Sequence, residues 1–311
     1  MLQSVLVTAE QTAILFVLMT FGVLARRLGM LDAANVKMLT SLVVNFTTPC
    51  IIISAFQCPF EPAKLPGLLW SALLAAIWYA LGIAAERFCI RGGEELRRKC
   101  LKWAVIFSNC GFMGLPLEYA LFGSDGVFYG VMPIAIFNFL AWTYGVSLFR
   151  PIKGGEDLLR GVLNPANVAS VMAVILFFLP WRLPEIVAAP VRLVGEMNTP
   201  LPMLILGYCL GGAKFSQVFR CGQSYIALSL RHFIIPMLFV GALMLFPALP
   251  LDLKLMAVVP AAAPTGVLLT VFAITFDADA EYSTAFVAVS TVLSIITIPL
   301  VIGLAGTLLT R

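Results

Sequence analysis

The sequence has few charged residues and almost no histidine. Asp, Glu, Lys and Arg make up 12% of its 311 residues, whereas a soluble domain carries roughly a quarter. His232 is the single histidine, and the chain has no run of like charge and no basic face with interleaved aromatic residues. We therefore expect no metal site, no cofactor and no nucleic-acid partner. An enzyme is not expected either, because no nucleophile–base pair or set of metal ligands is evident.

The cysteines show no pattern of a disulfide or metal-binding framework. No two of them form a CxxC pair, and only Cys58 falls on the outer side of a membrane in the topology derived below. We interpret them as reduced residues that behave as small apolar side chains. The seven are Cys50, Cys58, Cys89, Cys100, Cys110, Cys209 and Cys221.

Long apolar stretches are abundant instead. Hydrophobic residues make up 61% of the chain, and its mean hydropathy is +0.99. A helix needs about 20 apolar residues to cross a bilayer. No basic segment precedes the first stretch, so we expect it to be a span rather than a cleaved signal. The stretches predict an all-α polytopic membrane protein with ten transmembrane helices, at roughly 7–25, 38–56, 66–85, 103–122, 127–149, 165–181, 197–213, 232–249, 255–276 and 282–309.

The basic residues are unevenly distributed between the two sets of connections. Fifteen of the 20 Lys and Arg residues fall in one set, which extends from Arg26 to Arg231. Basic loops stay in the cytoplasm, so this set predicts the cytoplasmic face, and both termini are expected on the other side. Short basic loops without an organelle signal indicate the cell (cytoplasmic) membrane. The opposite set holds Lys64, Arg182, Arg192, Lys254 and Arg311.

The chain divides into two halves of five spans each, 1–152 and 153–311. Asn45-x-x-x-Pro49 in the second span matches Asn198-x-x-x-Pro202 in the seventh, 153 residues later. An odd number of spans per half means that the halves enter the membrane in opposite senses. We therefore predict a 5+5 inverted repeat. Unrelated helices in tandem are the alternative.

Two spans are interrupted by glycine and proline at corresponding places in the halves. The segments are 108–117 and 260–267, and their prolines Pro116 and Pro264 lie 148 residues apart. A break frees backbone groups that lipid cannot satisfy, so it persists only where protein or a water-filled cavity receives them. A matched pair is typical of a secondary transporter whose site lies between half-helix ends. Two half-helix N-termini at one point favour an anion, while the opposing C-termini would hold a cation or balance the field.

Few polar side chains accompany the breaks. Asn109 offers a donor and an acceptor beside the first break, and no Arg or Lys is expected at that depth. We interpret Asn138 as a residue that holds helices together, with a place in the site as the alternative. Glu118 is a candidate for ion or proton coupling, with a place at the outer rim as the alternative. The predicted substrate-binding residues are Asn109, Gly114, Pro116, Pro264, Thr265, Asn45 and Asn198.

Several strings of residues carry a family resemblance. They are Asn45–Pro49, Phe107–Leu117 with Ala120–Gly123, Trp142-Thr143, Asn164-Pro165, Pro200–Met203 with Gly207, and Ser290–Ser294 with Ile298-Pro299. Together they resemble the auxin efflux carrier family of membrane transporters, in its bacterial branch. The resemblance covers nearly the whole chain. It implies a ten-helix inverted repeat similar to those of sodium–proton antiporters and bile-acid symporters.

The resemblance also implies a division between spans. Spans 1, 2, 6 and 7 would form a scaffold domain, and spans 3–5 and 8–10 a mobile transport domain in which spans four and nine cross. The family's crossing-point residues correspond to Asn109, Pro116 and Pro264. Plant members have glutamine where this chain has Thr265, and a longer loop than the linker at 151–160, so auxin itself is not expected. Bacterial relatives are associated with small carboxylates such as malate or malonate, and relatives suggest a homodimer.

The leading hypothesis is therefore a secondary transporter that moves a small organic anion, a mono- or dicarboxylate, by alternating access. A membrane sensor that binds a ligand without moving it, and a carrier of a non-anionic solute, are the alternatives. The cytoplasmic connections are short, which disfavours a signalling role. The sequence leaves open whether protons, sodium ions or the membrane potential drive transport.

Overall fold

A computed structural model describes residues 2–58, 61–151, 155, 159, 163, 165–179 and 182–310 of the chain. The described secondary structure is helical, apart from an isolated two-residue bridge. Six helical segments are long and apolar enough to cross a membrane. They are Leu6–Arg27, Ala33–Ala55, Pro62–Cys89, Cys110–Gly145, Gly222–Leu243 and Ala280–Leu309. This agrees with the polytopic membrane protein that the sequence predicts.

The first half consists of long helices with short connections. α1 (Leu2–Arg27) is followed by α2 (Ala33–Leu42), whose first turn is capped by the Asp32 carboxylate accepting from the Asn35 N–H. The predicted second span therefore begins earlier than expected. The remaining elements are α3 (Thr48–Ala55), the short η2 (Pro62–Lys64), α4 (Leu65–Cys89), α5 (Glu95–Ile106) and α6 (Leu115–Leu140), which continues through η4 (Ala141–Gly145).

Proline introduces wide helical turns rather than breaks at several points. The π-type turns η1 (Val43–Thr47), η3 (Cys110–Gly114) and η5 (Leu230–Ile234) each lead into a helix whose second residue is proline. Proline has no N–H and clashes with the carbonyl four residues earlier, and a turn with one extra residue relieves both problems. Pro116 therefore lies inside continuous helix, which corrects the prediction that it interrupts the fourth span.

The bend that separates the predicted fourth and fifth spans lies at Gly123. Its φ of 63° is in the left-handed region, which glycine adopts without strain. α6 therefore consists of two helices that meet at a kink at Gly123.

The second half departs more from prediction. An unexpected helix, α9 (Glu185–Glu196), occupies the predicted connection between the sixth and seventh spans. The apolar segment that corresponds to the predicted eighth span covers 222–243 instead of 232–249. Residues of the predicted linker at 151–160 lie largely outside the described part, as does Asn164. The other elements are α8 (Pro165–Phe178), α10 (Pro200–Gly212), α11 (Phe215–Phe219), α12 (Gly222–Ser229), α13 (Ile235–Leu243), α14 (Leu251–Ala262), α15 (Leu268–Thr275) and α16 (Ala280–Leu309).

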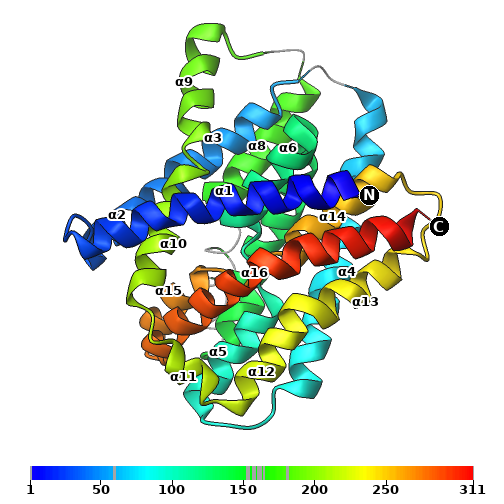
Figure 1. The fold of residues 1–311 in the computed structure, drawn as a ribbon. Coiled ribbons are helices and arrows are strands. Elements are labelled where there is room, and N and C mark those ends of the chain that lie inside the picture. Colours follow the sequence, from blue (N-terminus) through cyan, green and yellow to red (C-terminus); the bar gives the residue numbers. More distant parts are fainter. Residues whose placement is uncertain are drawn as a thin grey trace.

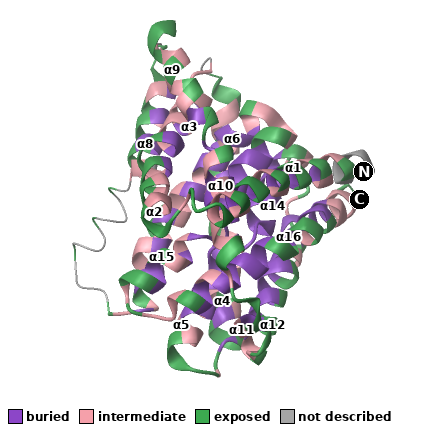
Figure 2. Cartoon of the chain, turned by 60° about the vertical axis from the view of Figure 1, so that its left-hand side comes forward, coloured by how far each residue is buried: buried purple, intermediate pink, exposed green. Residues whose placement is uncertain are grey.

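Helices α1 and α16 lie side by side and bring the two ends of the chain together (Figure 1). α1 also packs closely along α10. At Gly207 an added Cβ would collide with the Met19 carbonyl and with Gly22, so the two backbones touch there. Buried residues fill the interior between α4, α6, α14 and α16 (Figure 2). Large apolar side chains such as Leu69 and Ile296 are exposed on the outside, as a lipid-facing surface requires.

Ion pairs mark two opposite ends of the molecule. Arg97 pairs with Asp279 at 2.9 Å and Lys214 with Glu281 at 2.6 Å, both at the start of α16. These residues belong to connections predicted to share the cytoplasmic face. At the far end of α4, Lys64 pairs with Asp125 at 2.9 Å.

Candidate functional site

Two interrupted helices cross at the centre of the site. Their extended stretches, residues 107–109 and 263–266, form the contact that we call the crossing. α5 ends at Ile106 and α14 at Ala262, and each is followed by a short extended stretch before the next helical segment begins. Ser108 and Thr265 form an antiparallel bridge between these stretches. The two breaks predicted from the sequence therefore exist and lie against each other. The first is at 107–109, however, earlier in the chain than Pro116.

Backbone hydrogen bonds close the crossing. The Asn109 N–H donates to the Pro264 carbonyl at 2.6 Å, and the Gly266 N–H donates to the Phe107 carbonyl at 2.9 Å. Each extended stretch thus satisfies polar groups of the other, which is the condition for a broken helix inside an apolar protein.

Side-chain hydroxyls complete the second break. The Thr265 N–H donates to Ser290 Oγ at 2.9 Å, and Thr265 Oγ1 donates to the Ala104 carbonyl at 3.2 Å. Ser290 Oγ also lies 2.8 Å from His232 Nε2, while His232 Nδ1 lies 2.9 Å from the Thr297 hydroxyl. Thr265 is fully buried and holds the crossing together. The sequence did not indicate the His232–Ser290 contact.

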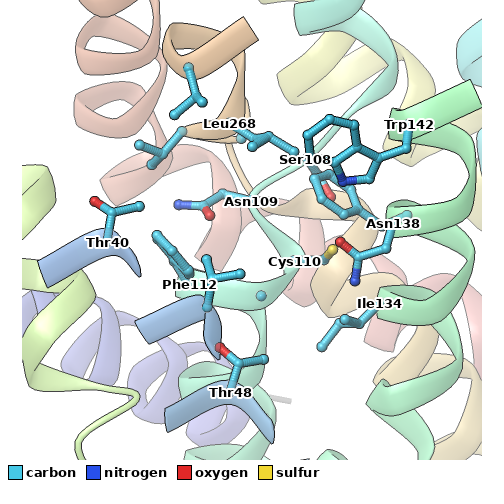
Figure 3. Close-up of a pocket in the computed structure, with 16 residues that line it drawn as sticks. Thr40, Thr48, Ser108, Asn109, Cys110, Phe112, Ile134, Asn138, Trp142 and Leu268 are labelled. Atoms are coloured by element: carbon cyan, nitrogen blue, oxygen red, sulfur yellow. The ribbon is translucent and has the colours of Figure 1, made fainter. Parts of the chain in front are cut away.

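A cavity of about 130 Å³ lies beside the crossing (Figure 3). Helical segments begin at Cys110 and Leu268, and both starting points line the cavity. The first N–H groups of a helix have no partner within it and carry a partial positive charge. None of the described residues that line the cavity is charged. They are Thr40, Val44, Thr48, Ser108, Asn109, Cys110, Gly111, Phe112, Ile134, Phe137, Asn138, Trp142, Gly266, Val267, Leu268 and Val271.

Asn109 is the polar side chain aimed most directly into this space. It is 5% exposed, and its Nδ2 has no hydrogen-bond partner within the described protein. Its amide extends from the crossing toward Thr40 on α2, and Asn138 and Trp142 stand on the other side (Figure 3). A buried amide donor without a partner is costly, so a ligand or water that accepts a hydrogen bond would be favoured there.

The other predicted site residues do not line the cavity. Pro264 and Thr265 form the crossing itself, and Gly114 and Pro116 pack inside the protein. Asn45 is exposed and donates to the Ser41 carbonyl of its own helix at 2.7 Å.

Asn198 has a structural role in the described contacts. It is fully buried, and its Oδ1 accepts from Thr47 at 3.2 Å and from Thr48 at 2.8 Å. Thr48 and Asn138 line the cavity although they were absent from the predicted set. The spacing of Ile134, Asn138 and Trp142, one helical turn apart, is the signal that marks their common face.

Glu118 lies inside the protein rather than at an exposed rim. It is 1% exposed, and its Oε1 has no hydrogen-bond partner among the described groups. The carboxyl group occupies the space that a side chain at Gly130 would need, and an added Cβ at Gly126 would meet the Glu118 carbonyl. The two glycines beyond the bend therefore make room for this residue.

A buried arginine contradicts the expectation that no cation lies at the crossing. Arg231 was assigned to a cytoplasmic loop, but it is fully buried in η5. Its Nη1 lies 3.3 Å from the carbonyls of both Val105 and Ile106, and its Nη2 donates to the Ala261 carbonyl. The guanidinium thus contacts the C-terminal ends of α5 and α14.

Comparison with known proteins identifies the family of the chain. The sequence pattern of a family described as membrane transport protein matches residues 7–302. The chain belongs to that family. This confirms the expected membership of the auxin efflux carrier family. The protein is therefore a multi-pass membrane transporter rather than an enzyme.

Two archaeal relatives are similar over much of their length. An uncharacterised transporter of Methanothermobacter thermautotrophicus is 26% identical over 308 residues, covering 94% of this chain and 97% of its own. An uncharacterised transporter of Methanocaldococcus jannaschii is 22% identical over 223 residues, covering 66% of this chain and 70% of its own. Both proteins are named as transporters, and neither name gives a substrate.

Proposed function

We propose that this transporter is a secondary carrier of a small organic anion, a mono- or dicarboxylate, across the cytoplasmic membrane. One observation carries the proposal: two helix N-termini and the unpaired Asn109 amide surround one cavity. Each helix N-terminus is equivalent to about half a positive charge. Two of them, with no acidic side chain among the described lining residues, favour a carboxylate.

The size and the walls of the cavity support an organic substrate. An apolar cavity of about 150 Å³ holds a molecule as large as benzene, so about 130 Å³ accommodates an acid of a few carbon atoms. Phe137, Trp142 and Leu268 offer apolar contacts to its carbon skeleton, while Thr40 and Thr48 offer hydroxyls. The absence of a full positive charge among these residues allows release as well as binding.

The placement of two cavities supports alternating access. The first lies between the α2–α3 segment and the crossing, and a second of about 290 Å³ lies between α3, α6 and α9. Thr48 borders the first and Ile51 the second, one helical turn further along. We infer that a transport domain slides past a scaffold at this interface, opening one cavity at a time.

The transport mechanism rests on a topology that is also part of the proposal. Ten spans form two inverted repeats, 1–152 and 153–311. Spans 1, 2, 6 and 7 form the scaffold, and spans 3–5 and 8–10 form the transport domain. Both termini lie outside the cytoplasm, and scaffold helices join two copies into a homodimer. Sodium coupling stays an alternative to proton coupling or to transport driven by voltage alone.

Glu118 is the residue proposed for proton coupling. An ionised carboxylate in its place would lose hydration without gaining a described partner for Oε1, which is costly. The buried Glu118 carboxyl group is therefore more stable in its protonated form in this conformation. If the opposite conformation exposes the carboxyl to water, it releases a proton there, and proton movement follows substrate movement.

Flux measurements in proteoliposomes test the carrier function. We expect saturable uptake of one or more labelled mono- or dicarboxylates, and loss of that uptake in Asn109→Ala. Asn45→Ala is the matched control, because Asn45 is exposed and bonded to its own helix. The methyl ester of a transported acid, which has a similar shape without the charge, should compete poorly. Uptake of neutral solutes in preference to acids would contradict the proposal.

Proton coupling has its own test in the same vesicles. An imposed pH gradient should drive substrate uptake in the wild type, and Glu118→Gln should remove that dependence while keeping exchange of substrate for substrate. A pH-gradient response that is unchanged in Glu118→Gln would exclude Glu118 as the proton carrier.

A further inference from the structure

The crossing has a negative side as well as a positive one. The ends of α5 and α14 leave carbonyl groups without helical partners, and each end carries about half a negative charge. Arg231 donates to Val105, Ile106 and Ala261, which are carbonyl groups of these two ends. One guanidinium charge therefore balances the two helix ends almost completely.

The surroundings of Arg231 supply no other balancing charge. No Asp or Glu of the described part of the chain forms an ion pair with it, and its Nε is buried without a partner. His232 beside it is engaged by the Ser290 and Thr297 hydroxyls. Isolated burial of a charge is very unfavourable, so the carbonyl groups must be what holds the arginine there.

Three carbonyl oxygens converging on one cation resemble the coordination that a small hard cation seeks. Here a covalently attached guanidinium fills that position. We propose that Arg231 is a built-in cation of the crossing, which holds the negative helix ends together and takes the place that a bound metal cation would otherwise occupy. This inference rests on the proposed function, because it assigns how the anion site on the other side of the crossing is kept positive.

Arg231 has a positioning role, because the residue acts through the helix ends and does not line the anion cavity. By neutralising the C-terminal ends, it leaves the field of the two N-termini available to the substrate. Removing the guanidinium should loosen the crossing and create a vacant group of carbonyl oxygens. A small external cation should then fill that space and restore both stability and transport.

Arg231→Gln tests this directly, with Arg26→Gln as the matched control. Arg26 also donates to a backbone carbonyl, that of Tyr208 at 3.0 Å, but away from the crossing. In detergent, we expect Arg231→Gln to have a lower thermal midpoint than the wild type. Millimolar guanidinium chloride or sodium chloride should raise it more than choline chloride does. The wild type and Arg26→Gln should show no such cation-specific increase.

Flux provides the second readout. Anion uptake by Arg231→Gln should fall roughly tenfold or more, as expected for losing hydrogen bonds from a charged group, and guanidinium or sodium should recover part of it. Arg231→Lys keeps the charge and should retain more anion uptake than Arg231→Gln. It replaces the glutamine variant in the flux test if that variant does not fold. A wild type that requires sodium for stability or uptake would overturn the inference. So would an Arg231→Gln variant that loses neither stability nor uptake, or one whose losses are not recovered specifically by guanidinium or sodium.

The two proposals fail in distinguishable ways. If the wild type moves no anion, the carrier function is wrong, and the cation dependence of the thermal midpoint still decides the role of Arg231. If the wild type moves an anion but only with sodium, the carrier function stands and the built-in cation is wrong.

Discussion

Ser108 and Thr265, which are 157 residues apart in the chain, pair as an antiparallel bridge at the point where two helices are interrupted. The bridge fixes the direction of four helix ends at once. Two N-termini face the cavity, and two C-termini face Arg231. Because both pairs depend on one short contact, residues that hold the crossing should affect stability and transport together.

Ser290 should be important for the stability of the crossing. Its hydroxyl accepts from the Thr265 N–H and lies against His232, so Ser290→Ala would leave two buried groups without partners. We expect a loss of about 1–3 kcal/mol in unfolding free energy, seen as a lower thermal midpoint in detergent. Ser294→Ala is the control, since Ser294 is equally buried and donates only within its own helix. Equal effects of the two substitutions would contradict this role.

Close contact between α1 and α10 predicts a second stability effect. Gly207→Ala would place a Cβ against the Met19 carbonyl and Gly22, forcing the helices apart. Overpacking of this kind costs about 1–3 kcal/mol. Gly241→Ala provides the comparison, because nothing lies within 4 Å of an added Cβ there. It should be neutral or slightly stabilising, since alanine favours helix more than glycine. Thermal unfolding of both purified variants would decide the matter.

Local sequence features were sufficient to predict the membrane class and the existence of two helix breaks. They do not locate the first break, because Pro116 predicts the interruption further along the chain than the structure has it. The structure accommodates that proline with a π-type turn, and the chain is extended earlier, at Ser108. A proline indicates where a helix must change, whereas tertiary pairing decides where the backbone becomes extended.

The site residues were harder to predict for a similar reason. The wide turn at η1 shifts which side chains face inward, so Thr48 lines the cavity while Asn45 is exposed. The sequence predicts Arg231 at the edge of a loop, because a charge within a membrane span is energetically costly. Its cost is offset by carbonyl groups that become free only where the helices break. That compensation comes from Ile106 and Ala261, far from Arg231 in the chain.

Glu118 and Gly130 should be coupled energetically. Gly130→Ala would collide with the Glu118 carboxyl, so we expect a lower thermal midpoint. Glu118→Ala removes the colliding atoms, and the double variant should therefore lose less stability than the two single losses added together. The coupling should be of the order of 0.5–3 kcal/mol. Strictly additive losses would mean that the glycine is needed for another reason.

Asn109→Asp should separate the charge of the site from its shape. Aspartate has nearly the same size, but its carboxylate faces the two helix N-termini in place of the substrate and repels an anion. We expect it to abolish anion uptake more completely than Asn109→Ala, with a thermal midpoint close to that of the wild type. Because acid neutralises the new carboxylate, uptake by Asn109→Asp should increase relative to the wild type as the pH falls. Uptake ratios of the variant to the wild type, measured for the same acid at each pH, correct for protonation of the substrate itself. A ratio that stays constant with pH would show that Asn109 does not face the transported charge.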